Sequence, residues 1–255
     1  MALLRLQEAI VYGPVSSRRL GCSLGLNILP VSYKLCSLNC VYCQYGWTKT
    51  LVREADSCLS ELPGVEDVTA ALTAALQELK ENGVRPSYVT FSGNGEPTLH
   101  PQFEQIVESV KKVRDRLAPE ALVAILSNST TVGDKSVRRA LEKLDVRVMK
   151  LDCGAEEGFS SYNRPCPGVE LEEIIGGLKR LKKFSLQSLF TNLNSDDESV
   201  KKWLSVLKVL KPLDVQVYTL DRSAPLAELK AVSKSTLEEI ARRVKSETGI
   251  PAEVF

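Results

Sequence analysis

The sequence has 255 residues, of which 44% are hydrophobic and 25% are charged, and its formal net charge is +1. A chain of this size buries roughly 70–75% of its unfolded surface and commonly forms one domain, so we expect a single domain over residues 1–255. The near-zero charge excludes a strong overall field that would attract nucleic acid, although a local basic patch would be enough to bind it.

The hydrophobic pattern indicates neither a membrane anchor nor secretion. No run of about 18 apolar residues is present, which predicts no membrane-spanning helix. The stretch from Met1 to Ile10 contains Arg5, Gln7 and Glu8 and lacks the apolar core of a signal peptide. Seven cysteines, three of them in one short stretch, favour a reducing environment over a disulfide framework, and we expect a cytoplasmic protein.

Alternating strands and helices are predicted from the spacing of apolar residues. Short strands are expected over residues 9–12 and 24–29, and the aperiodic stretch 48–64 is expected to be a loop. Later strands are predicted over residues 88–91, 121–126, 146–152, 185–191 and 215–220, and helices over residues 68–79, 103–113, 137–144, 171–181, 200–210 and 237–244. Counting 24–29 as the first strand gives six βα units, whose strands pair in parallel through right-handed crossovers. The predicted fold class is therefore α/β, an open, partial (βα)6 TIM barrel with a short N-terminal extension.

A cysteine-rich loop follows the first barrel strand. Cys36, Cys40 and Cys43 are spaced C-x3-C-x2-C. A loop with this spacing can turn three thiolates toward one centre, as a cluster of soft metal ions requires. Three thiolates on a [4Fe–4S] cluster leave the fourth iron open to a small molecule that carries an amine and a carboxylate. We therefore predict a cluster-binding loop.

Two alternatives to an iron–sulfur cluster remain open at this point. A structural zinc site usually adds a second, distant pair of ligands, but no second C-x2-C is present and the one histidine, His100, is far along the chain. Three cysteines can also pack as small apolar residues, although the polar residues around them disfavour a core segment.

Two motifs together resemble the radical S-adenosylmethionine (SAM) superfamily. The cysteine spacing with Tyr42 just before the third cysteine is similar to the signature of that superfamily. Downstream, the segment Gly93-Asn94-Gly95-Glu96-Pro97 resembles the "GGEP" motif with which these enzymes hold the methionine amino group of SAM. The segments 13–21, 126–128 and 218–222 further resemble a single-domain branch related to wyosine-type tRNA-modifying radical SAM enzymes.

The resemblance implies an enzyme with a [4Fe–4S] cluster and SAM as cofactors. In such enzymes the reduced cluster gives one electron to SAM, which yields methionine and a 5′-deoxyadenosyl radical that takes a hydrogen from the substrate. The implied partner is an external one-electron donor of the flavodoxin or ferredoxin type. The cofactors supply the reactive chemistry, and the protein positions them and excludes water.

The candidate site residues all end or follow predicted strands, where α/β barrels place their catalytic groups. Cys36, Cys40 and Cys43 are the implied cluster ligands. The predicted cofactor-binding residues are Tyr42, Gly93, Asn94, Gly95, Glu96, Ser127, Asn128, Asp152, Tyr218 and Thr219. Lys150 is a predicted catalytic residue that either forms a Schiff base with a carbonyl substrate or pairs with Asp152 or with a cofactor carboxylate.

The substrate stays open between three classes. An RNA-modifying enzyme would set Arg18, Arg19, Lys49 and Arg53 against phosphates, and a tRNA base would be its substrate. An enzyme that acts on a small metabolite or peptide fits the near-zero charge, and a non-catalytic iron–sulfur or zinc-binding protein is the third class. Wyosine-forming enzymes hold a second cluster on N-terminal cysteines, which this sequence does not reproduce, but Cys58, Cys153 and Cys166 are candidates for an auxiliary metal site.

Overall fold

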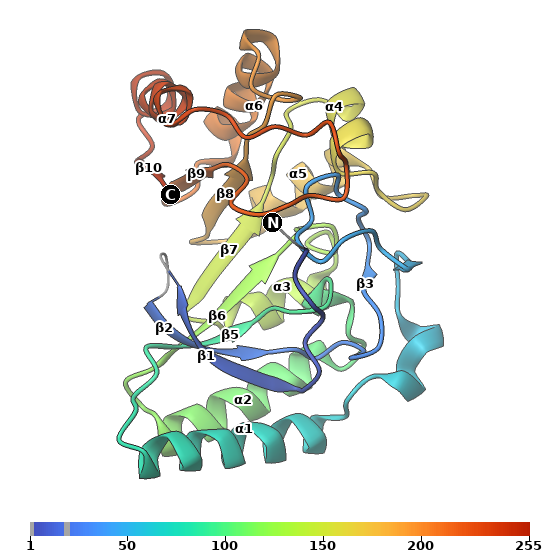
Figure 1. The fold of residues 1–255 in the computed structure, drawn as a ribbon, viewed down its shortest axis with the longest axis vertical. Helices are drawn as coiled ribbons and strands as arrows, with labels where there is room; N and C mark the ends of the chain where they lie inside the picture. The colour runs from blue at the N-terminus through green and yellow to red at the C-terminus, as the bar shows by residue number, and fades with distance from the viewer. Residues whose placement is uncertain (1–2, 18–20) are drawn as a thin grey trace.

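A computed structural model describes residues 3–17 and 21–255 (Figure 1). Helices surround the outside of a curved eight-stranded sheet. The strands of this sheet are β1 (Val11–Ser17), β2 (Gly21–Leu26), β5 (Tyr88–Phe91), β6 (Leu122–Ser127), β7 (Val146–Lys150), β8 (Ser185–Leu189), β9 (Val215–Tyr218) and β10 (Ala252–Val254). A separate parallel pair joins β3 (Leu35–Cys36) to β4 (Thr50–Leu51).

Seven α-helices and two 3-10 helices complete the described part of the chain. They are α1 (Val65–Glu81), α2 (Phe103–Leu117), α3 (Lys135–Glu142), α4 (Glu156–Tyr162), α5 (Leu171–Arg180), α6 (Asp197–Leu210), α7 (Lys234–Thr248), η1 (Asp56–Glu61) and η2 (Pro97–Leu99). Within residues 3–17 and 21–255, none of the helices combines the length and the hydrophobicity needed to cross a bilayer.

The sheet has the topology of a partial barrel. Its strand order is β1-β2-β5-β6-β7-β8-β9-β10, and every neighbouring pair from β2 to β10 is parallel. Helices connect these parallel strands as the six predicted βα units require. The two edge strands, β1 and β10, do not pair with each other in the described part of the chain. The α/β class and the open, partial barrel are therefore confirmed.

Five elements differ from the sequence-based expectation. β1 continues to Ser17 and pairs antiparallel with β2. The pairing register shifts between Tyr12 and Val15, where the strand passes through Gly13-Pro14. α4 and β10 were not predicted, since they have seven and three residues and are too short for a clear hydrophobic period. The stretch 48–64 is mostly loop, as expected, but it contains β4 and η1.

The N-terminal extension lies against the loops that follow the first two barrel strands. The Leu4 amide donates to the Gln44 carbonyl at 2.8 Å, just after the last cysteine of the motif. The Gln7 backbone amide donates to Asn94 Oδ1 at 2.8 Å, and Asn94 Nδ2 donates to the Gln7 backbone carbonyl at 2.9 Å. The extension therefore braces both predicted cofactor loops from outside.

The core beneath the later strands is centred on Trp203 of α6. Its side chain is 1% exposed and packs edge-on against Phe190, with 5.0 Å between the ring centroids. Its indole Nε1 donates to the Leu151 carbonyl at 3.0 Å, directly after β7. Packing of α6 thus fixes the end of the strand that carries Lys150.

We expect Trp203→Ala to lower the free energy of unfolding by about 3–5 kcal/mol, the usual effect of removing a large buried ring. Trp203→Phe should lose less, because the phenyl ring still fills part of the space and Ser188 Oγ also donates to the same carbonyl at 2.6 Å. Urea unfolding measures both, with exposed Lys201→Ala on the same helix as the control. Equal losses in the two Trp203 variants would contradict the packing argument.

Candidate active site

The three motif cysteines lie on one loop that a distant segment supports. All three thiols are free; those of Cys36 and Cys40 are buried, and that of Cys43 is partly exposed. The Asn39 amide donates to the Asn163 carbonyl at 3.0 Å, and the Cys166 amide donates to the Ser37 carbonyl at 3.0 Å. Residues 163–166, between α4 and α5, therefore hold one flank of the cysteine loop.

The glycine loop after β5 lies directly beside the first motif cysteine. The Leu35 amide donates to the Asn94 carbonyl at 2.9 Å, and the Glu96 amide donates to the Leu35 carbonyl at 3.2 Å. A Cβ atom added to Gly95, whose φ is +144°, would lie 1.6 Å from that Leu35 carbonyl oxygen. Only glycine permits this approach, so the two predicted motifs meet through backbone contact.

Gly93, the first glycine of this loop, also serves packing inside the protein. A Cβ atom at Gly93, where φ is +133°, would lie 2.6 Å from the Asn27 side-chain oxygen. The Asn94 side chain is buried and bonds to Gln7 and to the Pro30 carbonyl. The Asn94 side chain therefore faces the N-terminal extension and holds the loop from behind.

Glu96 ties the glycine loop to the end of β6. Its carboxylate is 1% exposed and accepts from Thr98 Oγ1 at 2.5 Å and Ser127 Oγ at 2.9 Å. The backbone amides of Thr98 and Asn128 also donate to it, at 3.1 and 2.5 Å. Burial raises the pKa of Glu96 although these hydrogen bonds favour the carboxylate. The structure thus brings Glu96, Ser127 and Asn128 together, as the sequence predicts.

Two carboxamides donate to two of the motif sulfurs. Asn128 Nδ2 lies 3.4 Å from Cys36 Sγ, and Asn163 Nδ2 lies 3.4 Å from Cys40 Sγ. Burial raises the pKa of Cys40 to about 11, the charge of Asp152 adds to this rise, and the Asn163 hydrogen bond opposes it. Amide donors of this kind stabilise thiolates and modulate the iron–sulfur clusters that they hold.

A buried lysine precedes the first motif cysteine. Lys34 is 4% exposed, and its Nζ donates to the Gly46 carbonyl at 3.0 Å. Burial alone would lower the pKa of Lys34, but the thiols of Cys43, Cys36 and Cys40 raise it, and the net change is upward. A cation among three thiols fits an anionic centre, so the residues present suit a thiolate-bound cluster.

Lys150 lies at the centre of the barrel mouth between two tyrosine rings. Its Nζ is 5.0 Å from the centre of the Tyr42 ring and 4.9 Å from that of Tyr218, and it donates to the Tyr218 hydroxyl at 2.6 Å. It also pairs with Asp152 Oδ1 at 3.3 Å. Burial alone would lower the pKa of Lys150, but the charge of Asp152 and the neighbouring Tyr218 and Cys40 together raise it, and the net change is upward.

Asp152 connects this centre to the cysteine loop. Its Oδ2 accepts from the Tyr42 hydroxyl and, at 2.9 Å, from Asn163 Nδ2. A continuous chain of contacts therefore runs from the Cys40 sulfur through Asn163 and Asp152 to the Lys150 ammonium. The Asn163 Oδ1 atom is the one buried side-chain oxygen or nitrogen without a hydrogen-bond partner in the described part of the chain.

One predicted cofactor-binding residue, Thr219, makes its hydrogen bonds to a neighbouring loop. Thr219 Oγ1 donates to the Phe190 carbonyl at 2.7 Å and accepts from the Val232 amide at 3.0 Å, so its hydroxyl fixes a loop. Arg18 and Arg19 lie outside the described residues.

Cys58, Cys153 and Cys166 do not gather at one point. Cys58 packs in a different apolar cluster from the other two thiols. Among the described residues, no three His, Cys, Asp or Glu side chains approach closely enough to hold a single metal ion. The three motif thiols are likewise too far apart to share one ion. A [4Fe–4S] cluster does not require them to, because it binds each thiolate to a different iron.

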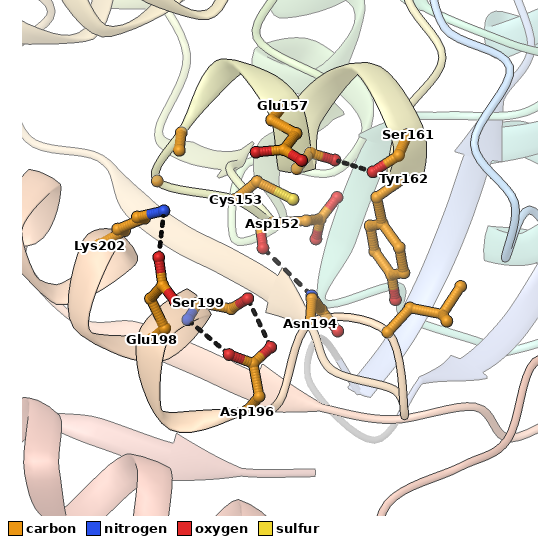
Figure 2. Close-up of a pocket in the computed structure, with 14 residues that line it drawn as sticks. Asp152, Cys153, Glu157, Ser161, Tyr162, Asn194, Asp196, Glu198, Ser199 and Lys202 are labelled. Carbon is orange, nitrogen blue, oxygen red and sulfur yellow. Dashed lines mark hydrogen bonds and ion pairs between the residues drawn. The ribbon is translucent and has the colours of Figure 1, made fainter.

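A cavity of about 270 Å³ lies beside Asp152, between α4 and the start of α6 (Figure 2). Cys153 forms part of its wall, and Asn194 Nδ2 donates to the Asp152 carbonyl at 3.1 Å. Lys202 pairs with Glu198 at 2.7 Å at the rim. The cavity is large enough for a small molecule, and Asp152 separates it from the cysteine loop.

Lys34 and Asn163 were not assigned a role from the sequence. A signal for Lys34 is present, because it is a charged residue only two positions before Cys36 in a stretch that is otherwise largely apolar. Asn163 has no comparable signal, since its contact with Cys40 joins positions 123 residues apart.

Comparison with known proteins agrees with this geometry. Residues 31–220 match the model of the radical SAM superfamily. The chain therefore belongs to the radical SAM superfamily and is a radical SAM enzyme, with a [4Fe–4S] cluster and SAM as cofactors, as predicted. A UPF0026 protein of Synechocystis sp. is 29% identical to this chain, and the match covers 94% of each sequence.

Solved structures share the fold. A radical SAM methyltransferase from Sphaerobacter thermophilus superposes with a TM-score of 0.65 at 16% identity, over 91% of this chain and 66% of that chain. TYW1 with a bound lysine–pyruvate adduct superposes with a TM-score of 0.61 at 13% identity, over 90% of this chain and 76% of that chain. At these identities the similarity concerns the fold alone.

We expect Gly95→Ala to displace the cysteine loop, because the new methyl group would collide with the Leu35 carbonyl. Overpacking and backbone strain should together lower the free energy of unfolding by at least about 2 kcal/mol and reduce the iron retained after anaerobic reconstitution. Gly133→Ala is the matched control, since a Cβ atom there meets nothing within 4 Å. Normal iron content and stability in Gly95→Ala would contradict the close contact.

Proposed function

We propose that this radical SAM enzyme binds its cluster through Cys36, Cys40 and Cys43 and cleaves SAM reductively beside the glycine loop. The observation that carries the proposal is the backbone contact between Leu35 and Gly95, which joins the cysteine loop to the loop that resembles a SAM-binding motif. When bound and reduced, the cluster supplies the electron that breaks the sulfonium bond of SAM.

The protein's own residues would bind and orient the cofactor. We assign the methionine ammonium of SAM to the loop of Gly93 to Glu96, which Ser127 and Asn128 hold in place through the Glu96 carboxylate. Tyr42 and Tyr218 flank Lys150 and offer aromatic surfaces for the adenine. Such contacts place the reactive carbon and exclude water, which is the protein's share of cofactor chemistry.

Lys150 acts in this proposal as a fixed cation. Its raised pKa keeps the amine protonated, and an ammonium has no lone pair with which to attack a carbonyl. The pair with Asp152 is one of the arrangements expected from the sequence. From this position the ammonium can orient a carboxylate of the cofactor or substrate, while Asp152 balances its charge.

A tRNA base is the proposed substrate. The shared fold with TYW1 and the branch-level sequence resemblance support this choice. Close to the cysteine loop, the Arg164 guanidinium stacks at 4.9 Å over the exposed Trp47 ring, and Lys49 and Arg53 are exposed nearby in the sequence. Aromatic and guanidinium planes stack on unpaired bases, and basic side chains contact phosphates.

A small metabolite or peptide is the second candidate substrate. The cavity of about 270 Å³ beside Asp152 favours this alternative, because it is large enough for a small molecule and is lined by side chains of α4, α6 and the loop after β8. In either case we propose an external flavodoxin- or ferredoxin-type electron donor and a cytoplasmic location.

We expect Cys36→Ala, Cys40→Ala and Cys43→Ala each to abolish SAM cleavage, because each removes one of only three cluster ligands. Anaerobically reconstituted wild-type protein should hold about four irons per chain and release 5′-deoxyadenosine after reduction with dithionite, as a single cluster requires. Cys22→Ala is the control and should keep both properties. Cleavage that survives all three motif changes would refute the assignment, and about eight irons would reveal a second cluster.

We expect tRNA to bind with an affinity that falls as salt concentration rises. Removal of one phosphate contact, by Lys49→Ala or Arg53→Ala, should weaken binding by up to about tenfold and reduce the slope of log K against log salt by about 0.7–0.9. Gel-shift or fluorescence titration at several salt concentrations measures this, with Lys201→Ala as the control. An enzyme that cleaves SAM but shows no tRNA binding at low salt would favour the small-molecule substrate.

A further inference from the structure

Asn128 and Asn163 each bring a carboxamide nitrogen against a sulfur of the cysteine motif. Asn128 Nδ2 lies 3.4 Å from Cys36 Sγ, and Asn163 Nδ2 lies 3.4 Å from Cys40 Sγ. Asn128 directly follows β6, whereas Asn163 directly follows α4. A cysteine binds metal as the thiolate, and a hydrogen bond to a charged acceptor is stronger than one to a neutral acceptor. Two sulfurs of the motif therefore face donors from two separate parts of the barrel.

Neighbouring groups fix the orientation of the Asn128 carboxamide. Its Oδ1 accepts from the Thr130 backbone amide at 3.0 Å and from Thr130 Oγ1 at 2.8 Å. A backbone amide can only donate, so the oxygen must face Thr130 and the nitrogen must face the cysteine loop. There Nδ2 also donates to Ser37 Oγ at 3.0 Å. Because a carboxamide carries two N–H donors, Asn128 can serve Ser37 and Cys36 together.

A carboxylate fixes the orientation of the Asn163 carboxamide. Its Nδ2 donates to Asp152 Oδ2 at 2.9 Å, and it also lies 3.3 Å from the Tyr42 hydroxyl. The Asp152 carboxylate pairs with the Lys150 ammonium and accepts hydrogen bonds, so an amide oxygen turned toward it would be repelled. The nitrogen of Asn163, and not the oxygen, therefore faces the Cys40 sulfur.

Packing and stability alone do not explain an asparagine at position 163. The residue is 3% exposed, and among residues 3–17 and 21–255 its Oδ1 is the one buried side-chain oxygen or nitrogen that lacks a hydrogen-bond partner. An unsatisfied buried acceptor costs about 1–3 kcal/mol. The small space beside Asn163 is lined in part by Leu38, Phe159 and Ile174, so an apolar side chain there would avoid this cost. The hydrogen bonds that Nδ2 makes are the compensating feature.

We propose that Asn128 and Asn163 raise the reduction potential of the cluster held by the motif, through hydrogen bonds to the sulfurs of Cys36 and Cys40. They are positioning residues for the electron-accepting step, and this inference rests on the proposed function. Reduction takes one electron from the external donor and adds one negative charge, which the cluster shares with its cysteine sulfurs. N–H donors at the sulfurs stabilise the more negative form, so they favour reduction.

A purely structural role for the two carboxamides makes a different prediction. If they only held the cysteine loop in place, their loss would lower stability and iron content, and the potential of the cluster that remains would not fall in step. If their loss admitted water to the site, the potential would rise, because water stabilises added charge better than the protein interior does. Loss of hydrogen bonds to sulfur lowers the potential. The sign of the shift therefore separates these cases.

The main test is an anaerobic redox titration of reconstituted protein without SAM, in which electron paramagnetic resonance follows the reduced cluster. Asn128→Leu and Asn163→Leu remove the donor and keep a side chain of similar size. At a fixed potential each should lower the ratio of reduced to oxidised cluster by about threefold, and the double variant by about tenfold, a downward shift of about 59 mV for one electron.

Asn194→Leu is the matched control for these substitutions. Its carboxamide is also buried and also bonds to Asp152, where Nδ2 donates to the backbone carbonyl at 3.1 Å. In the part of the chain that the structure describes, Asn194 makes no hydrogen bond to a motif sulfur. We expect its replacement to leave the potential unchanged.

A second measurement uses the unsubstituted protein and does not depend on how the variants fold. The protein is produced with asparagine that carries ¹⁵N in the side-chain amide alone, and the reduced cluster is studied by pulsed electron paramagnetic resonance. An N–H group bonded to a cysteine sulfur transmits a weak coupling between the ¹⁵N nucleus and the unpaired electron. We expect this coupling in wild-type protein and a weaker signal in each leucine variant.

Each outcome decides the inference. Unchanged or higher potentials in both single variants would overturn it, and so would an equal downward shift in Asn194→Leu. If the leucine variants retain no iron, the labelled wild-type protein decides: ¹⁵N coupling supports the inference, and its absence overturns it. Wild-type protein that holds no cluster would instead refute the proposed function, which keeps the two failures apart.

Discussion

The contact between the Leu35 carbonyl and Gly95 is the constraint on which the site depends. It fixes the start of the cysteine loop against the loop after β5, and a side chain larger than hydrogen at Gly95 would separate them. The backbone hydrogen bonds on either side of this contact extend it into a short parallel bridge. Two loops that are about 55 residues apart in sequence thereby become one wall of the barrel mouth.

Charge balance is the second requirement of the buried site. Lys34 lies on the outer side of the cysteine motif, near Gly46, and Lys150 lies on the inner side, between Tyr42 and Tyr218. Asp152 pairs with the inner lysine, whereas the outer lysine faces thiols. Buried charges are stable only with partners, and of the two lysines it is Lys150 whose partner is a carboxylate in the described part of the chain.

Much of the architecture could be predicted from the sequence, because apolar periodicity identifies long helices and buried strands without knowledge of tertiary contacts. The six βα units and the meeting of Cys36 with the glycine loop followed from this pattern and from motif resemblance. The role of Gly93 and Gly95 was not predictable in the same way. Both glycines were predicted to bind the cofactor, and a Cβ atom at either would come closest to Asn27 or Leu35 of the protein itself. Sequence shows that a close approach occurs but not which group makes it.

The contacts that sequence could not supply are those made by Asn163 and Asp152, and they explain why the end of β7 is so important to the site. Asp152 Oδ1 accepts from the Leu189 amide at 2.8 Å, which orients the carboxylate from the neighbouring strand β8. Its Oδ2 is then left for Tyr42 and Asn163, and its carbonyl for Asn194 at the wall of the cavity. Because both strands hold the Asp152 carboxylate, it can position Lys150 and also Asn163, which donates to the Cys40 sulfur. The geometry of the site therefore depends on β7 and β8 as much as on the two recognisable motifs.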